Sequence, residues 1–138
     1  MNEEQLLERS EQFALRVMRV VRAVPRTTTA RAIADQIARS GPSVHANYRA
    51  ACKAPSRAEF ISKLGTVEEE ADETAGWLKL LVKGGILSEK RLGPLLAEAR
   101  ELVAIFAASR KTAAHNEQLQ LANRKLQIRQ PSRRRHPK

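Results

Sequence analysis

The stretch from Arg39 to Phe60, RSGPSVHANYRAACKAPSRAEF, holds most of the side chains that could do chemistry. His45 and Cys52, the only cysteine, stand seven residues apart, and a histidine base beside a thiol is the usual form of a cysteine nucleophile. On one helix, however, seven residues span about 10 Å along the axis, which is too far for proton transfer. The spacing argues against a cysteine nucleophile, and Cys52 is expected to pack as a small hydrophobic residue.

The run Glu68–Glu73 is the densest group of carboxylates and would be the natural place for a metal. A di-iron site in a helical bundle requires Glu-x-x-His pairs, and neither His45, His115 nor His136 follows a glutamate at that spacing. The chain also has no second cysteine for a zinc site and no glycine-rich phosphate loop. The sequence therefore predicts a protein with no catalytic residues, no metal and no cofactor.

Positive charge is concentrated at the C-terminal end of the chain. The 138 residues carry 25 Lys+Arg and 15 Asp+Glu, a net charge of +10, of which residues 110–138 hold nine basic residues and one acidic residue, or +8. Such a segment predicts contact with RNA, DNA or another polyanion, although a basic tail can also serve solubility alone. The candidate nucleic-acid-binding residues are Arg124, Lys125, Arg129, Arg133, Arg134 and Arg135.

A second basic group lies near the N-terminus, where Arg16, Arg19, Arg22 and Arg26 recur every three or four residues. This spacing puts them on one stripe of the helix expected from about Glu3 to Val24. The stripe is a further candidate for binding nucleic acid; the alternatives are a solvated face and contact with acidic helices nearby.

Hydrophobic periodicity predicts an all-α protein. We expect helices over residues 3–24 and 29–54, a third that starts at a Ser56–Glu59 capping box and ends at Gly84-Gly85, and a fourth that follows Pro94 and continues past Ala113 towards residues 119–128. Short connections favour antiparallel neighbours. The predicted fold is an antiparallel up-down four-helix bundle over residues 1–113, with a kinked second helix, followed by a basic tail, residues 114–138, that is partly helical and then disordered.

Gly41-Pro42 interrupts the second helix. The apolar stripe nevertheless continues across this dipeptide, because Ile37, Val44 and Tyr48 project onto one face at 100° per residue. One kinked helix is therefore expected. A helix-turn-helix motif for DNA is the alternative, but its register would put Asn47 where that motif needs an apolar residue.

Polar residues of the second and third helices have structural uses in assembly. Asn47 is expected to bond a carbonyl freed by Pro42, which has no amide proton to donate. Arg49 and Lys53 are expected to pair with acidic residues of the third helix or of a neighbouring subunit. These acidic residues are Glu69, Asp72 and Glu73.

Nothing in the sequence predicts a membrane partner. The apolar runs are far shorter than the roughly 20 residues of a membrane span. The N-terminus, MNEEQLLERSEQ, is acidic, whereas a signal peptide begins with basic residues. We expect a cytoplasmic protein.

Three stretches carry a resemblance to a known family: FALRVMRVVRAVP, then ARSGPSVHANYRAACKAPSRAEFISKLGTVEEEADETAGWLKLLVKGGIL, and finally ELVAIFAASRKTA. Over about residues 5–113 the chain resembles the 23S rRNA intervening-sequence protein family, and its most specific part is the run from Ser43 to Leu64. The resemblance implies a four-helix bundle, commonly a homopentamer, without established catalytic activity. The family is also similar to accessory proteins of diversity-generating retroelements, so a ribonucleoprotein or a reverse transcriptase is an implied partner.

Together these features predict a non-catalytic, oligomeric helical-bundle protein that binds RNA or another nucleic acid through its basic surface and tail. The alternative is a structural assembly or adaptor protein with no nucleic-acid role. The basic tail lies outside the resemblance, so its function rests on charge alone.

Overall fold

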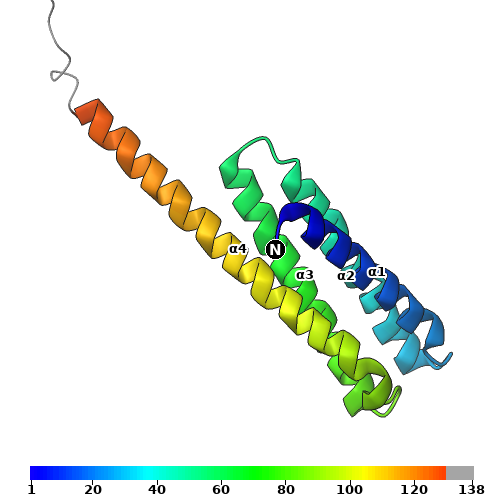
Figure 1. Ribbon diagram of the computed structural model, residues 1–138. Helices are drawn as coiled ribbons and strands as arrows, with labels where there is room; N and C mark the ends of the chain where they lie inside the picture. The colour runs from blue at the N-terminus through cyan, green and yellow to red at the C-terminus, as the bar shows by residue number, and fades with distance from the viewer. Residues whose placement is uncertain (130–138) are drawn as a thin grey trace, which may run out of the picture.

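The computed structural model describes residues 1–129, which form four helices and contain no strand. The helices are α1 (Glu3–Ala23), α2 (Thr28–Cys52), α3 (Arg57–Lys83) and α4 (Glu89–Arg129). Successive helices run in opposite directions and pack side by side (Figure 1). The predicted all-α, up-down four-helix bundle is confirmed. The predicted disorder of residues 130–138, and the candidate residues Arg133, Arg134 and Arg135, lie outside the described residues.

Polar side chains cap the helix starts. The Ser56 hydroxyl accepts from the Glu59 amide at 3.2 Å, as predicted, but no return bond from the Glu59 side chain is seen in residues 1–129. A complete capping box occurs instead at α1, where Asn2 and Gln5 bond each other's amides at 2.8 and 3.0 Å. The Ser88 hydroxyl accepts from the Arg91 amide at 3.2 Å and fixes the start of α4.

All four helices contribute to one hydrophobic core. The rings of Tyr48 and Phe106 meet in it with their centroids 5.3 Å apart. The largest fully buried apolar side chains are Phe13 and Val17 of α1, Ile37 and Val44 of α2, Leu64, Val67, Leu78 and Leu81 of α3, and Leu92, Leu102 and Phe106 of α4. Within this arrangement α1 packs mainly on α2 and touches α4 only lightly.

α2 passes through Gly41-Pro42 as one helix, and Ile37 and Val44 on either side are fully buried. Since no turn divides residues 28–52, this segment does not form a helix-turn-helix motif. The predicted partner of Asn47 was wrong. Its side-chain amide donates to the Ser43 carbonyl at 2.9 Å, because that carbonyl lies one turn back on the same helix, whereas the carbonyl that Pro42 leaves unbonded is that of Ala38.

The start of the fourth helix was also predicted wrongly. α4 begins at Glu89 rather than after Pro94, so Pro94 lies inside the helix. Pro94 leaves the Lys90 carbonyl, four residues before it, without its helical hydrogen bond, and the Ser88 cap offsets part of that cost. The buried residues Leu92 and Leu95 stabilise this turn through the core.

The far end of α4 extends beyond the bundle, as the sequence predicts (Figure 1). Ala113 is the last buried residue of α4. Residues 114–129, called here the α4 extension, add about 24 Å of helix at 1.5 Å per residue. Several large apolar side chains of this extension are exposed, at 44–74%: Leu119, Leu121, Leu126 and Ile128.

Candidate nucleic-acid interface

The α4 extension presents its basic side chains to solvent. Arg124, Lys125 and Arg129 are all exposed, and Glu117 is the only acidic residue of the extension. At 100° per residue, Lys111, Lys125 and Arg129 lie within about 40° of one another around the helix axis. One basic face therefore runs from the end of the bundle along the extension. The projecting helix can lie along a polyanion without unfolding the bundle.

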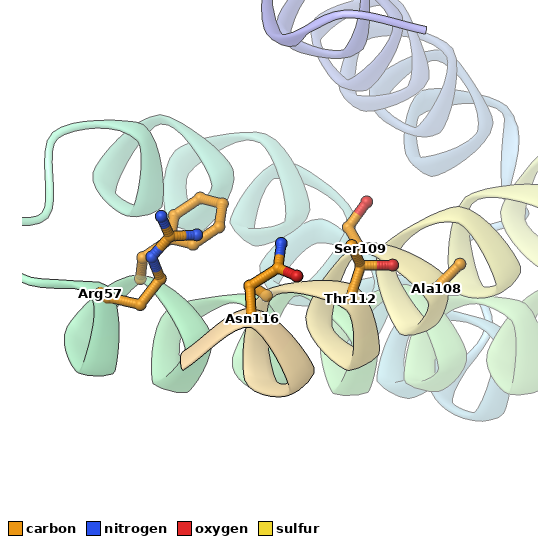
Figure 2. Close-up of a pocket in the computed structure, with 7 residues that line it drawn as sticks. Arg57, Ala108, Ser109, Thr112 and Asn116 are labelled. Carbon is orange, nitrogen blue, oxygen red and sulfur yellow. The ribbon is translucent and has the colours of Figure 1, made fainter. Parts of the chain in front are cut away.

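A polar hollow lies where α4 leaves the bundle. It has a volume of about 400 Å³, and Figure 2 shows Arg57 of α3 together with Ser109, Thr112 and Asn116 of α4 around it. The apolar residues Phe60, Ala108 and Ala113 complete the lining. Arg57 has no carboxylate within ion-pair distance in residues 1–129. The guanidinium, hydroxyl and amide groups are the donors that proteins use for phosphate and sugar oxygens. At 100° per residue Ser109, Thr112 and Asn116 lie 100–160° around α4 from Lys111, so the hollow offers these donors on another side of the helix from the basic face.

The arginine stripe of α1 is largely free of ion pairs. Arg16 is half-buried, while Arg19, Arg22 and Arg26 are exposed. Arg26 follows the last residue of α1, Ala23, so three of the four arginines share the helical stripe. None of the four pairs with a carboxylate in the part of the chain that the structure describes.

Sequence reasoning missed one cation at this surface. Arg91 of α4 lines a second hollow, of about 260 Å³, together with Arg16 and Arg19. We call this site the arginine hollow; its other lining residues are Val20, Leu92 and Leu95. Arg91 was missed because the fourth helix was expected to begin after Pro94, which left Arg91 in a loop. The Ser88 cap was the available signal for the earlier start.

Three other arginines are engaged in ion pairs. Arg9 bonds Glu98 at 2.7 and 2.8 Å and pairs with Glu101 at 3.1 Å, and the bond to Glu98 raises the pKa of the Arg9 guanidinium. Arg110 bonds Glu68 at 2.7 Å. These two arginines hold helices together and are not available to an anion.

Arg39 forms the remaining ion pairs, with Glu70 and Glu73 of α3. The Arg39 hydrogen bond lowers the pKa of the Glu73 carboxyl. Glu73 is thus paired within the chain, but with Arg39 rather than with Arg49 or Lys53.

The other residues predicted to serve assembly are not brought together within the chain. Arg49 of α2 and Lys53, the residue that follows α2, are exposed, and Glu69 and Asp72 are exposed on α3. No ion pair involves any of these four side chains within residues 1–129. The surface therefore offers two unpaired groups of opposite charge on neighbouring helices.

Ser10 and His45 form a contact that the sequence did not reveal. The Ser10 hydroxyl lies 2.9 Å from His45 Nδ1 and donates to the Leu7 carbonyl at 3.0 Å. Ser10 is fully buried, and the contact with His45 joins α1 to α2.

Cys52 lies half-buried beside the core, as predicted. Burial raises the pKa of its thiol, which keeps it in the protonated, less reactive form. Across residues 1–129, no three His, Cys, Asp or Glu side chains gather as a metal-binding group. None of the four helices combines the length and the apolar character that crossing a membrane requires.

The fold and these surfaces are those of a small all-helical bundle whose last helix projects as a basic arm. More particularly, the chain belongs to the 23S rRNA-intervening sequence protein family, whose model matches residues 2–108. The predicted family resemblance is confirmed. The α4 extension lies beyond the matched residues.

A solved structure shares this fold. It is a protein of unknown function from the S23 ribosomal protein family of Bacteroides thetaiotaomicron VPI-5482, with 30% identity and a TM-score of 0.74. The match covers 80% of this chain and 99% of that chain. The curated proteins include no match.

Proposed function

We propose that this protein is a non-catalytic, oligomeric helical bundle of the cytoplasm that binds RNA through the basic faces of α1 and α4. The observation that carries the proposal is the α4 extension, about 24 Å of exposed helix whose charged residues are three cations and one glutamate. The side chains of this helix bury almost no apolar surface against the bundle. Its stability and its charge are therefore best explained by a polyanionic partner.

RNA is favoured over DNA by the polar hollow at the base of the extension. Arg57, Ser109, Thr112 and Asn116 offer donors and acceptors to both phosphate and 2′-hydroxyl groups, and the latter are absent from DNA. The family name refers to sequences inserted into 23S rRNA, which agrees with this choice. Equal binding of an RNA and a DNA of the same sequence would contradict the preference.

The proposal is tested by shortening the chain to end at Ala113. Each phosphate neutralised releases counterions, so the logarithm of the binding constant falls with the logarithm of salt concentration. If Arg124, Lys125, Arg129 and the Arg133–Arg135 triplet make about five phosphate contacts, truncation lowers that slope by about four. The measurement is the Kd of a fluorescein-labelled single-stranded RNA over a series of KCl concentrations. An unchanged slope would show that the tail is merely solvated.

Self-assembly is the second function that the surface supports. Arg49 and Lys53 carry positive charge, Glu69 and Asp72 carry negative charge, and none of the four has an ion-pair partner within residues 1–129. Contacts between subunits can pair the two groups, and the pentamer implied by the sequence resemblance needs two different, complementary surfaces on each subunit.

Reversing each charge group separately tests this assembly. Arg49→Glu with Lys53→Glu, or Glu69→Lys with Asp72→Lys, should dissociate the oligomer because like charges then meet. Combining all four substitutions should restore it. Light scattering reports the mass. A wild-type protein that is monomeric at micromolar concentration would exclude the assembly. An oligomer that does not bind RNA would instead support the alternative role as a structural adaptor.

A further inference from the structure

The line of contact between α1 and α4, called here the seam, has different charges at its two ends. At one position Arg9 of α1 donates to Glu98 of α4 at 2.7 and 2.8 Å. Seven residues further along α1 stands Arg16, and seven residues back along α4 stands Arg91. The helices are antiparallel and seven residues make about two turns, so Arg16 and Arg91 repeat the register of the first pair. Here an arginine replaces the carboxylate.

The arginine hollow forms at this second position. Arg16, Arg19 and Arg91 line it above three buried apolar side chains, Val20, Leu92 and Leu95. No acidic residue lines the hollow, and none of its three arginines has a carboxylate within 4.0 Å in residues 1–129. Three arginine side chains therefore line one hollow without a counter-ion from the described chain.

This placement is unfavourable for the isolated protein. Like charges across the seam repel one another, where the Arg9–Glu98 pair attracts. Arg91 also stands in the first turn of α4, the positive end of the helix dipole, where a cation is disfavoured. The bond from the Arg91 amide to the Ser88 hydroxyl holds it in that turn. An anion in the hollow relieves both effects.

The chemistry of the lining selects the anion. Guanidinium groups donate in pairs to the oxygens of a phosphate and keep their charge at all physiological pH values. The half-buried Arg16 and the apolar floor exclude part of the surrounding water, which strengthens each charge–charge contact. The donors and the apolar floor of the hollow therefore suit a phosphate group.

We propose that Arg16, Arg19 and Arg91 form a phosphate-binding site that holds one backbone phosphate of the bound RNA. This inference rests on the proposed RNA binding and adds to it a contact on the bundle itself. The site lies at the end of α4 opposite the extension, so the RNA is held by the α4 extension and anchored separately at the seam.

Arg91→Gln tests the site, and Arg100→Gln is its matched control. Arg100 is exposed on the same helix, nine residues after Arg91. At 100° per residue this is two full turns plus 180°, so Arg100 lies on the opposite face of α4. It lines another hollow that holds Lys79, Lys83 and Glu89. Loss of one phosphate contact by Arg91→Gln should lower the salt slope for a fluorescein-labelled single-stranded RNA by about 0.7, while Arg100→Gln leaves the slope unchanged.

Inorganic phosphate provides a readout that does not depend on RNA. At matched ionic strength, replacing chloride by phosphate should raise the Tm of the wild type and of Arg100→Gln more than that of Arg91→Gln. Phosphate also stabilises folded proteins in general, and the control variant accounts for that effect. Arg91→Glu should raise the Tm in chloride, because the introduced carboxylate can pair with Arg16 as Glu98 pairs with Arg9, and should weaken RNA binding beyond Arg91→Gln.

The outcomes separate this inference from the proposed function. If RNA binds but Arg91→Gln changes neither the salt slope nor the phosphate effect, the site is overturned and RNA binding stands. Equal losses in Arg91→Gln and Arg100→Gln would also overturn the site, because they indicate diffuse attraction. If phosphate stabilises through Arg91 but the full chain binds no RNA, the proposed function fails, and with it the RNA part of this inference.

Discussion

The chain contains two Gly-Pro dipeptides inside helices, and the two have opposite surroundings. A Cβ placed on Gly41 would lie 2.5 Å from Cγ1 of Val17, whereas a Cβ on Gly93 would meet no atom within 4 Å other than its chain neighbours and the nearby backbone of its own helix. Gly41-Pro42 lies where α2 presses against α1, and Gly93-Pro94 lies near the start of α4. The same two residues thus permit close helix packing in one place and only interrupt a hydrogen bond in the other.

The residues just before Gly41 also connect α2 to α3. The buried hydroxyls of Ser40 and Thr74 share a hydrogen bond at 2.8 Å, and Arg39 pairs with Glu70 and Glu73. The Gly41 segment is therefore held from two sides, by α1 and by α3. A helix interruption is tolerated when neighbouring helices hold the segment, and its glycine is required only where another helix approaches.

Gly41→Ala should produce the largest effect on stability. The new methyl group overlaps the fully buried Val17, and overpacking of this kind costs about 1–3 kcal/mol, partly offset by about 1 kcal/mol of improved helix propensity. We expect a net loss of up to about 2 kcal/mol in the free energy of unfolding, measured by urea denaturation. The double variant with Val17→Ala should lose less than the sum of the two single variants. Strict additivity would show that Val17 is not the obstacle.

Gly93→Ala should have a smaller effect of opposite sign. No other side chain approaches Gly93 and it has no positive φ, so alanine gains helix propensity of about 0.5–1 kcal/mol, reduced in part by contact of its Cβ with the neighbouring Pro94 ring. The expected result is a higher Tm. A lower Tm would contradict the proposed difference between the two dipeptides, because glycine would then be required at both.

The smallest effect is expected at Glu73, whose pairing with Arg39 supports the Gly41 segment. The pKa of Glu73 is lowered in the folded state, so the pair contributes stability above the ordinary value of 4.5 and loses it as pH falls through the folded value. Glu73→Gln should therefore be less stable than the wild type at neutral pH and equally stable well below pH 4.5. Exposed ion pairs contribute little, so the difference is smaller than for either glycine.

Urea denaturation at the two pH values measures this difference, and Glu11→Gln is the control. Glu11 is exposed, has no ion pair within residues 1–129 and takes no part in the proposed assembly, so it controls for the loss of a surface carboxylate. A difference for Glu73→Gln that persists in acid would point to lost packing rather than to lost charge.

Most of the fold could be predicted because the signals are local. The apolar stripe through Ile37, Val44 and Tyr48 indicated that α2 continues across Pro42, and Gly84-Gly85 marked the end of α3. The start of α4 was harder to predict, because a Gly-Pro dipeptide occurs both before a helix and inside one. Which of the two applies depends on whether a cap and buried residues support the turn around it. Ser88 and the buried Leu92 and Leu95 decided that case.

The four helices, their apolar faces and the concentration of charge near the C-terminus could all be read from the amino-acid sequence, since each depends on residues close together in the chain. Which charges have partners depends on the packed bundle. Arg9 and Arg16 are alike in sequence, yet one meets Glu98 and the other shares a hollow with Arg91. That outcome depends on the register between α1 and α4, which the packing of the whole core sets and no local pattern contains.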